Sequence, residues 1–379
     1  MRAVVIGAGP IGLDAAIALE DAGHEVVVFE GGEVGHHMRR WGHVELFTPM
    51  EMNTTARGRV RAGDPDHPDL APRITGGALV DRYLIPIART LDVRTGTEVL
   101  GVTRLHLRKG DQLGSRARSV EPFRLLVRPA KGSEMDMTAD LVVDCGGVLG
   151  DPAPAGRGGL CCPGERDVRN AHRIRYGPVP VKDLAGATVL LVGDGASAVT
   201  ALGQLLEGEA TVHWATPRLE TPGFVSPPDD PLPLRAALHA LGRDAPGAPG
   251  VRHHGADCVE RFDAATDGVN VLLESGATFR VDHVVVCTGF RPDATVTREL
   301  QMHLCWGTEG PMRLAAALLS ASGGAGGGDC LDAPALDAGA LRSPEPGLFV
   351  LGAKSYGRRS DFLLRNGYAQ VDDLLTLIG

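Results

Sequence analysis

The sequence predicts an α/β protein in which a strand-helix-strand unit occurs twice. Apolar strands at residues 2–6 and 187–192 each run into a glycine-rich turn, GAGPIG and GDGASA, which opens a helix with apolar residues at helical spacing. A second strand follows each helix, at residues 25–29 and 210–214. Parallel strands joined by a crossover helix are typical of Rossmann-like folds, so we expect two such domains.

The composition is that of a folded chain with room for two domains. Its 379 residues are 43% hydrophobic and 22% charged, which is enough for two packed cores. A net charge of −9 disfavours nucleic acid as a partner, because phosphate binding requires clustered Lys and Arg. The apolar runs are far shorter than the roughly 20 residues that span a bilayer. No leader-like segment precedes the first strand, so we expect a cytoplasmic protein without a membrane partner.

The first glycine turn has the residues that a dinucleotide site requires. Gly7 permits the tight turn, Gly9 the close approach of a diphosphate, and Gly12 the close packing of the helix on the strand. The diphosphate would lie at the helix N-terminus, where backbone N–H groups and the helix dipole favour anions. Glu30 ends the second strand 18 residues after Gly12, where a carboxylate can bind ribose hydroxyl groups. A chance glycine-rich turn is the alternative interpretation.

The second turn repeats this pattern with Gly193, Gly195 and Ser197, and has Ala198 in the place of the third glycine. Two such turns indicate two nucleotide ligands, or a duplicated fold in which one site has lost its ligand. No carboxylate ends the strand that follows. Arg218 comes there instead, and an arginine at this place favours the 2'-phosphate of NADPH over NADH. A solvent-exposed arginine without a ligand is the alternative.

Other segments connect these units. Residues 92–107 and 123–127 alternate in polarity and predict an antiparallel excursion from the first domain. Residues 146–164 are rich in glycine and proline and predict a linker, and the proline-rich residues 222–250 predict a surface excursion. The glycine run at residues 323–328 predicts a loop.

The order of these motifs resembles that of the two-dinucleotide-binding-domain flavoproteins, which include thioredoxin-reductase-like enzymes and flavin-containing monooxygenases. The resemblance covers nearly the whole chain. LVVDCGG (141–147) and VVVCTGFRPD (284–293) are similar to the junctions at which the chain of these proteins crosses between domains. FVLGAKSYGR (349–358) is similar to their late strand, whose following glycine approaches the FAD diphosphate and ribityl chain.

The resemblance implies two Rossmann-like domains of the three-layer ββα/βα kind, with the NAD(P)H-binding domain inserted into the FAD-binding domain. The FAD-binding domain would comprise residues 1–160 and 288–379, and the NAD(P)H-binding domain residues 165–287. The last helix would start near Ser360 or Asp361 and direct its N-terminus at the flavin pyrimidine edge.

The resemblance also implies which residues hold the two cofactors, FAD and NADPH. Those implied for FAD lie in the first turn, in the segment after the second strand, at strand ends and before the last helix: Gly7, Gly9, Pro10, Gly12, Glu30, Arg39, Trp41, Val99, Gly147, Gly352, Ser360, Asp361 and Phe362. Those implied for NADPH are Gly193, Gly195, Ser197, Ala198 and Arg218. Trp41 would either stack near the flavin or fill the core.

Cysteine usage disfavours the disulfide-reductase branch of this family. Seven scattered cysteines indicate reduced thiols, and no two of them have the CxxC spacing of a redox dithiol. Disulfide reductases of this type have an aspartate right after the late glycine, where this chain has Ala353. The adjacent Cys161 and Cys162 could form only a strained ring, so they are either weak candidates for redox thiols or linker cysteines without a catalytic role.

The monooxygenase branch requires no protein thiol. Its fingerprint FxGxxxHxxxY before the second glycine turn is half present: His172 and Tyr176 match, whereas Arg166 and Val168 stand at the Phe and Gly positions. His172 could equally be a surface histidine. His43 is a further weak candidate for proton transfer in a substrate site.

These observations order the possible functions. We expect first an NADPH-dependent flavin monooxygenase that oxygenates sulfur or nitrogen of a small molecule. The second is a thiol/disulfide oxidoreductase or dithiol oxidase acting through the flavin, with Cys161 and Cys162 as possible participants. The third is a non-catalytic nucleotide-binding redox sensor. The histidine pairs at 36–37 and 253–254 lack further ligands at metal-binding spacing, so no metal is expected. The resemblance suggests a homodimer.

Overall fold

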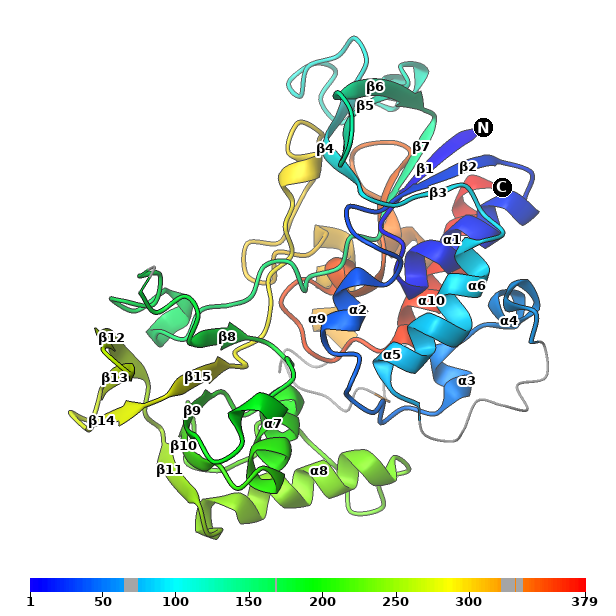
Figure 1. Ribbon diagram of the computed structural model, residues 1–379. Coiled ribbons are helices and arrows are strands. Elements are labelled where there is room, and N and C mark those ends of the chain that lie inside the picture. Colours follow the sequence, from blue (N-terminus) through cyan, green and yellow to red (C-terminus); the bar gives the residue numbers. More distant parts are fainter. Residues whose placement is uncertain (65–73, 168, 322–330, 332–336) are drawn as a thin grey trace. The chain divides into compact units, whose positions relative to one another are not determined.

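The computed structural model describes residues 1–64, 74–167, 169–321, 331 and 337–379. The chain divides into two compact units: unit 1 comprises Met1–Gly150 and Arg291–Gly379, and unit 2 comprises Asp151–Phe290 (Figure 1). The glycine run at 323–328 and Val168 of the half-matched fingerprint lie outside the described residues.

Unit 1 is built on a five-stranded parallel sheet with the strand order β16-β7-β1-β2-β3. Most apolar side chains in four of these strands are buried on both faces of the sheet, as is typical of parallel sheets, whereas the short edge strand β3 is partly exposed. The strands are β1 (Arg2–Ile6), β2 (Glu25–Phe29), β3 (Val93–Arg94), β7 (Leu141–Asp144) and β16 (Leu348–Val350).

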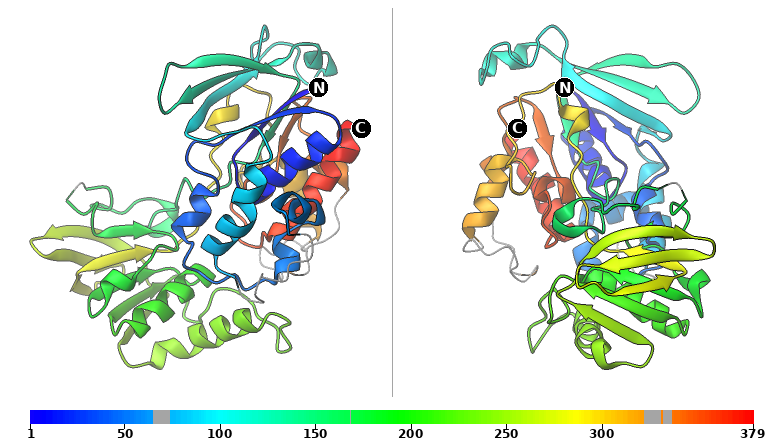
Figure 2. Two further views of the ribbon diagram at one scale, coloured as in Figure 1. Left: turned by 45° about the vertical axis from the view of Figure 1, so that its right-hand side comes forward. Right: turned by 90° about the vertical axis from the view of Figure 1, so that its left-hand side faces the viewer.

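Alternate residues of β1 face two different cores of unit 1. Val5 packs with helices α1 (Pro10–Asp21) and α10 (Leu364–Ile378), and Val4 packs with an antiparallel sheet on the opposite face. That sheet consists of β4 (Thr97–Arg104), β5 (Phe123–Pro129) and β6 (Met135–Ala139). The predicted antiparallel excursion therefore forms one of three layers. Figure 2 shows this antiparallel sheet on one side of the parallel sheet and the helices on the other side.

Shorter helices of unit 1 surround these layers. They are α2 (His36–Arg40), α3 (Met50–Asn53), α4 (Ala56–Ala62), α5 (Gly76–Leu79), the π-helical turn η1 (Val80–Leu84), α6 (Ile85–Ala88), α9 (Met312–Ala321) and the 3-10 helix η9 (Gly352–Tyr356).

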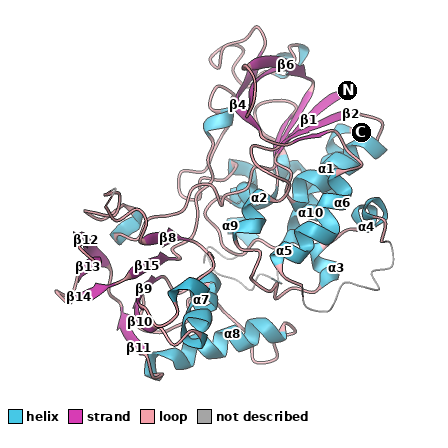
Figure 3. Cartoon of the chain, viewed as in Figure 1, coloured by secondary structure: helices cyan, strands magenta, loops and turns pink. Residues whose placement is uncertain are grey.

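Unit 2 repeats the layered plan with its own parallel sheet, in the order β11-β10-β9-β15-β8 (Figure 3). An antiparallel sheet, β12-β13-β14, covers one core and helix α7 packs on the other. The elements are β8 (Ile174–Tyr176), β9 (Thr188–Val192), α7 (Ala196–Glu207), β10 (Thr211–Thr216), α8 (Pro233–Asp244), β11 (Val251–Gly255), β12 (Val259–Ala265), β13 (Gly268–Leu273), β14 (Thr278–Val281) and β15 (His283–Val286).

Three segments differ from what the sequence predicts. Residues 151–160 and 288–290, expected in the first domain, belong to unit 2. Gly156 forms a β-bridge with Val259, and Phe290 forms one with Pro152. Residues 222–250, expected as a surface excursion, contain α8, whose Gly242 lies against Val199 of α7. The prolines in this segment favour the prediction of a loop. A proline in the first turn of a helix is nevertheless compatible with α8, because it costs no hydrogen bond there.

Within the described ranges, no helix combines the length and the apolar composition that crossing a membrane would require.

Candidate dinucleotide-binding sites

The first glycine turn is shaped by close backbone contacts within unit 1. Gly7 has φ +100°, and its N–H donates to the carbonyl of Phe29 at 2.7 Å. A β-carbon on Gly7 would lie 2.8 Å from the carbonyl oxygen of Cys145, and a β-carbon on Gly12 would overlap the carbonyl oxygen of Gly7. Glycine is therefore required at both positions, because any side chain would push α1 away from the sheet.

The start of α1 leaves room for an anion. Gly9 is its N-cap residue, and no side-chain oxygen caps the helix. Among the described residues, no atom beyond Gly9 and its two chain neighbours lies within 4 Å of where a β-carbon of Gly9 would be. Pro10 occupies the first turn, where its missing N–H group costs nothing. The free N–H groups of the next residues can therefore donate to a diphosphate, so this turn fits a dinucleotide.

Glu30 holds the same turn from the end of β2. Its Oε2 accepts a hydrogen bond from Ala8 N at 2.9 Å, and its Oε1 accepts one from Gly32 N at 2.8 Å. A carboxylate has about four acceptor sites, so these two bonds leave capacity for the ribose hydroxyl groups that the sequence assigns to Glu30.

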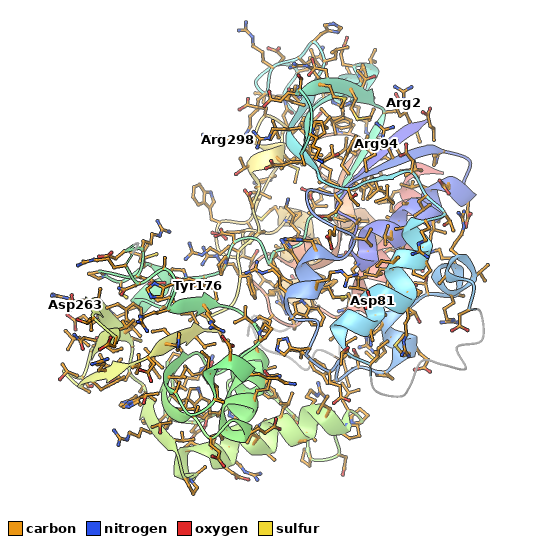
Figure 4. The ribbon with its side chains drawn as sticks, viewed as in Figure 1. Arg2, Asp81, Arg94, Tyr176, Asp263 and Arg298 are labelled. Atoms are coloured by element: carbon orange, nitrogen blue, oxygen red, sulfur yellow. The ribbon has the colours of Figure 1, made fainter. Side chains whose placement is uncertain are left out.

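Helix α2 also starts at the first turn, because Gly35 N donates to the carbonyl of Ala8 at 3.0 Å. Its Arg39 donates a hydrogen bond at 2.8 Å to Asp81, which is labelled in Figure 4. Trp41 packs on Gly76, where a β-carbon would lie 2.5 Å from the indole ring, and its ring contributes to the core of unit 1. Val99 is buried in the core between the two sheets.

The carboxyl ends of β7 and β16 come to the same turn as the first glycines. Gly147 follows β7 and has φ +70°, and Gly352 follows β16 and has φ +72°. Gly352 N donates to Gln370 of α10 at 2.8 Å, and its α-carbon faces Ile11 of α1. Both glycines that the resemblance implies for FAD therefore belong to the carboxyl edge of the unit 1 sheet.

The last helix begins later than expected. Residues Ser360 and Asp361 precede α10, which starts at Leu364. The Asp361 carboxylate does not cap the helix because it binds Arg359, at 3.0 and 2.5 Å. Phe362 packs edge-on against Tyr356. The first turn of α10 still lies at the first glycine turn, since a β-carbon on its Gly367 would be 2.5 Å from Ile11 Cδ1.

The second glycine turn has the same backbone contacts within unit 2. Gly193 has φ +118°, and its N–H donates to the carbonyl of Ala215 at 3.0 Å. A β-carbon there would overlap the carbonyl oxygen of Cys287. Gly195 is the N-cap residue of α7 and no side chain caps this helix. The turn tolerates Ala198 as its third small residue, fully buried, and it too fits a dinucleotide.

Arg218 lies beside this second turn. Its Nη1 is 3.3 Å from Oδ2 of Asp194, the residue between the two glycines, and donates to the carbonyl of Gly223 at 3.2 Å. The Arg218 side chain is 60% exposed, so the guanidinium remains open to a ligand. Ser197 lies half-buried in the first turn of α7. The sequence identified Arg218 but not Asp194, because no pattern assigns a role to that position.

The cysteine pair is part of the unit 2 structure. The backbone of Cys162 donates to Glu165 Oε2 at 3.0 Å, and the same carboxylate accepts from Ala155 N and from the Tyr176 hydroxyl, each at 2.8 Å. Burial and the adjacent Glu165 charge raise the pKa of Cys162 to about 12. Its thiol therefore stays protonated at neutral pH. Cys161 is half-buried beside it.

The two candidate histidines lie apart in the chain, one in each unit. His172 is exposed in the turn before β8, and His43 is half-buried in the turn after α2. Among the described residues, no group of His, Cys, Asp and Glu is arranged to hold a metal ion.

Comparison with known proteins identifies the family. Residues 1–310 match the pyridine nucleotide-disulphide oxidoreductase family. The chain belongs to this family. It is thus an FAD- and NAD(P)-dependent oxidoreductase, as the resemblance implies. No curated protein matches the chain in sequence.

Solved structures share its fold at low sequence identity. A bacillithiol disulfide reductase from Bacillus cereus is 17% identical with a TM-score of 0.72, over 100% of this chain and 99% of the other. A flavin-containing monooxygenase from Stenotrophomonas maltophilia is 18% identical with a TM-score of 0.64, over 99% and 97%. The thioredoxin reductase of T. acidophilum is 14% identical with a TM-score of 0.62, over 99% and 97%. These likenesses confirm the fold class.

The geometry of the first turn predicts the effect of one methyl group. In Gly12→Ala the new β-carbon meets the Gly7 carbonyl, so α1 must move off the sheet, which costs about 1–3 kcal/mol or more. We expect purified Gly12→Ala protein to carry much less FAD and to unfold at lower urea concentration. Gly101→Ala is the control, because within the part of the chain that the structure describes only its own chain neighbours come within 4 Å of a β-carbon there. Normal FAD content in Gly12→Ala would refute the proposed packing.

Proposed function

We propose that this oxidoreductase takes hydride from NADPH onto FAD and passes the electrons to oxygen, with oxygenation of sulfur or nitrogen in a small molecule. The observation that carries this proposal is the pair of dinucleotide turns, each uncapped at its helix start and each in a separate parallel sheet. FAD, when bound, supplies the hydride-accepting and oxygen-reducing chemistry of the proposed reaction.

Unit 1 would hold FAD through the first turn. The backbone N–H groups at the start of α1 would donate to the diphosphate, and Glu30 would accept from ribose hydroxyl groups. The turn needs no rearrangement for this, because its hydrogen bonds to Glu30 and to Phe29 already fix its shape. Binding then costs little conformational entropy.

Unit 2 would hold NADPH through the second turn. The start of α7 would bind the diphosphate, and Arg218 would bind the 2'-phosphate that distinguishes NADPH from NADH. Support comes from the position of Arg218, whose guanidinium is 3.3 Å from the turn residue Asp194 and is largely exposed.

The role of Arg218 predicts a change in coenzyme preference. A charge-assisted hydrogen bond contributes about 1.5–3 kcal/mol, so Arg218→Ala should weaken NADPH binding roughly tenfold or more. NADH binding should weaken less, because NADH has no 2'-phosphate to lose and is affected only through the uncompensated charge of Asp194. The dissociation constants can be measured by calorimetry on the oxidised protein, with the exposed Arg243→Ala as control. Equal loss of both coenzymes in Arg218→Ala would contradict the assignment.

Oxygen is the preferred acceptor because the cysteine pair is poorly suited to redox chemistry. Burial raises the pKa of the Cys162 thiol and leaves little thiolate to attack a disulfide. Burial also raises the pKa of Cys287, to about 12, and that of Cys145. An oxygenating flavoenzyme requires no protein thiol.

Disulfide reduction is the second candidate, favoured by Cys305. Hydrogen bonds from the Thr308 side chain, and from the Thr308 and Gly307 backbones, lower the pKa of this thiol. The resemblance in fold to the bacillithiol disulfide reductase supports the same candidate.

The two candidates predict different products. With NADPH, air and thioanisole, we expect sulfoxide formation coupled to NADPH consumption, and the double variant Cys161→Ser/Cys162→Ser should retain the rate within about twofold. Disulfide reduction would be favoured instead if hydrogen peroxide accounted for all the oxygen consumed. In that case the protein should also oxidise NADPH without air when a small disulfide is present. The Cys305→Ser variant should lose this disulfide-dependent NADPH oxidation.

A further inference from the structure

A buried ion pair lies at the carboxyl edge of the unit 1 sheet. Asp144, the last residue of β7, is in register with Ile6 of β1 and Val350 of β16. Lys354 belongs to η9, and its Nζ is 2.6 Å from Asp144 Oδ2. The two side chains are 8% (Lys354) and 1% (Asp144) exposed. The pair therefore lies at the ends of strands β1 and β16, next to the turns at Gly7 and Gly352.

The ammonium group is close to the first glycine turn. A β-carbon on Gly146 would lie 3.8 Å from Lys354 Nζ. The α-carbon of Gly146 is in turn 3.3 Å from the position of a β-carbon on Gly7. In open α/β sheets, ligands bind outside the carboxyl ends of the strands, and this is where the diphosphate of a dinucleotide would enter.

The pair has spare hydrogen-bonding capacity on its cationic side. An ammonium group has three N–H donors, and within the described part of the chain Nζ donates to one acceptor, the Asp144 carboxylate. The Asp144 carboxylate, in contrast, also accepts from Gly146 N at 3.0 Å. A buried ion pair is commonly no more stabilising than apolar residues of the same size. Packing alone therefore does not account for a lysine at this edge.

We propose that Lys354 donates to the diphosphate of FAD and that Asp144 is a positioning residue that holds its ammonium group at the first turn. This inference rests on the proposed binding of FAD to unit 1. It adds a cation from the chain itself to the backbone donors of α1.

The test measures binding of FAD and of ADP to flavin-free protein by calorimetry. ADP carries the diphosphate but no flavin, so it reports on the diphosphate alone. The variants are Lys354→Met, Asp144→Asn and the double variant, with Lys109→Met as control. Lys109 is an exposed lysine of the same unit that donates to the Arg298 carbonyl at 2.7 Å. Circular dichroism establishes that each variant is folded.

We expect Lys354→Met and the double variant to bind both FAD and ADP about tenfold more weakly or worse. Asp144→Asn should bind both ligands more weakly, because the ammonium group of Lys354 loses the carboxylate that holds it at the turn. A purely structural ion pair predicts the opposite pattern: the double variant, which retains no buried charge, would bind like the wild type.

Three results would overturn the inference: wild-type affinity in the double variant, unchanged binding of both ligands in Asp144→Asn, or loss of FAD affinity without loss of ADP affinity. Loss of FAD affinity alone would place the Lys354 ammonium group at the flavin instead of the diphosphate. A lowered flavin midpoint potential in Lys354→Met would support that location. If the wild-type protein itself bound neither FAD nor ADP, the proposed function would fail rather than this inference alone.

Discussion

The close contact between strand, turn and helix at each glycine cluster is the constraint on which the rest of the structure depends. At Gly7 the chain turns with φ +100° directly beneath the carbonyl of Cys145, and Gly12 of α1 lies against the Gly7 carbonyl. This contact places the uncapped start of α1 at the carboxyl edge of the sheet. The same edge receives the ends of β7 and β16 and the first turn of α10, so segments far apart in the sequence meet at one backbone turn.

The two units apply this constraint with different chemistry around it. In unit 1 a carboxylate, Glu30, closes the turn by accepting from Ala8 N, whereas in unit 2 the residue between the glycines is itself acidic and is paired with Arg218. Asp194 adds negative charge at a helix start that would bind a diphosphate, and Arg218 compensates for it. The buried Asp144–Lys354 pair performs a similar compensation in unit 1. In both units an acidic side chain at or near the glycine turn is thus paired with a cationic side chain from elsewhere in the chain.

The sequence predicts the parts of this structure that local patterns control. Both strand-helix-strand units occur where glycine spacing and apolar periodicity place them, because these patterns report directly on backbone geometry. The start of α10 and the helix α8 were not predictable in the same way. Asp361 looks like a helix cap but binds Arg359, and prolines conceal α8. The Asp144–Lys354 pair joins residues 210 positions apart, and only the sheet register brings them together.

We propose that both turns are occupied in one catalytic cycle, with NADPH as the reductant of FAD. This proposal is tested most directly by titrating the oxidised protein with NADPH, and separately with NADH, in the absence of oxygen while following the visible absorption of the flavin. The account predicts a yellow protein that NADPH bleaches at lower concentration than NADH. A protein without flavin, or a bound flavin that neither coenzyme reduces, would contradict it.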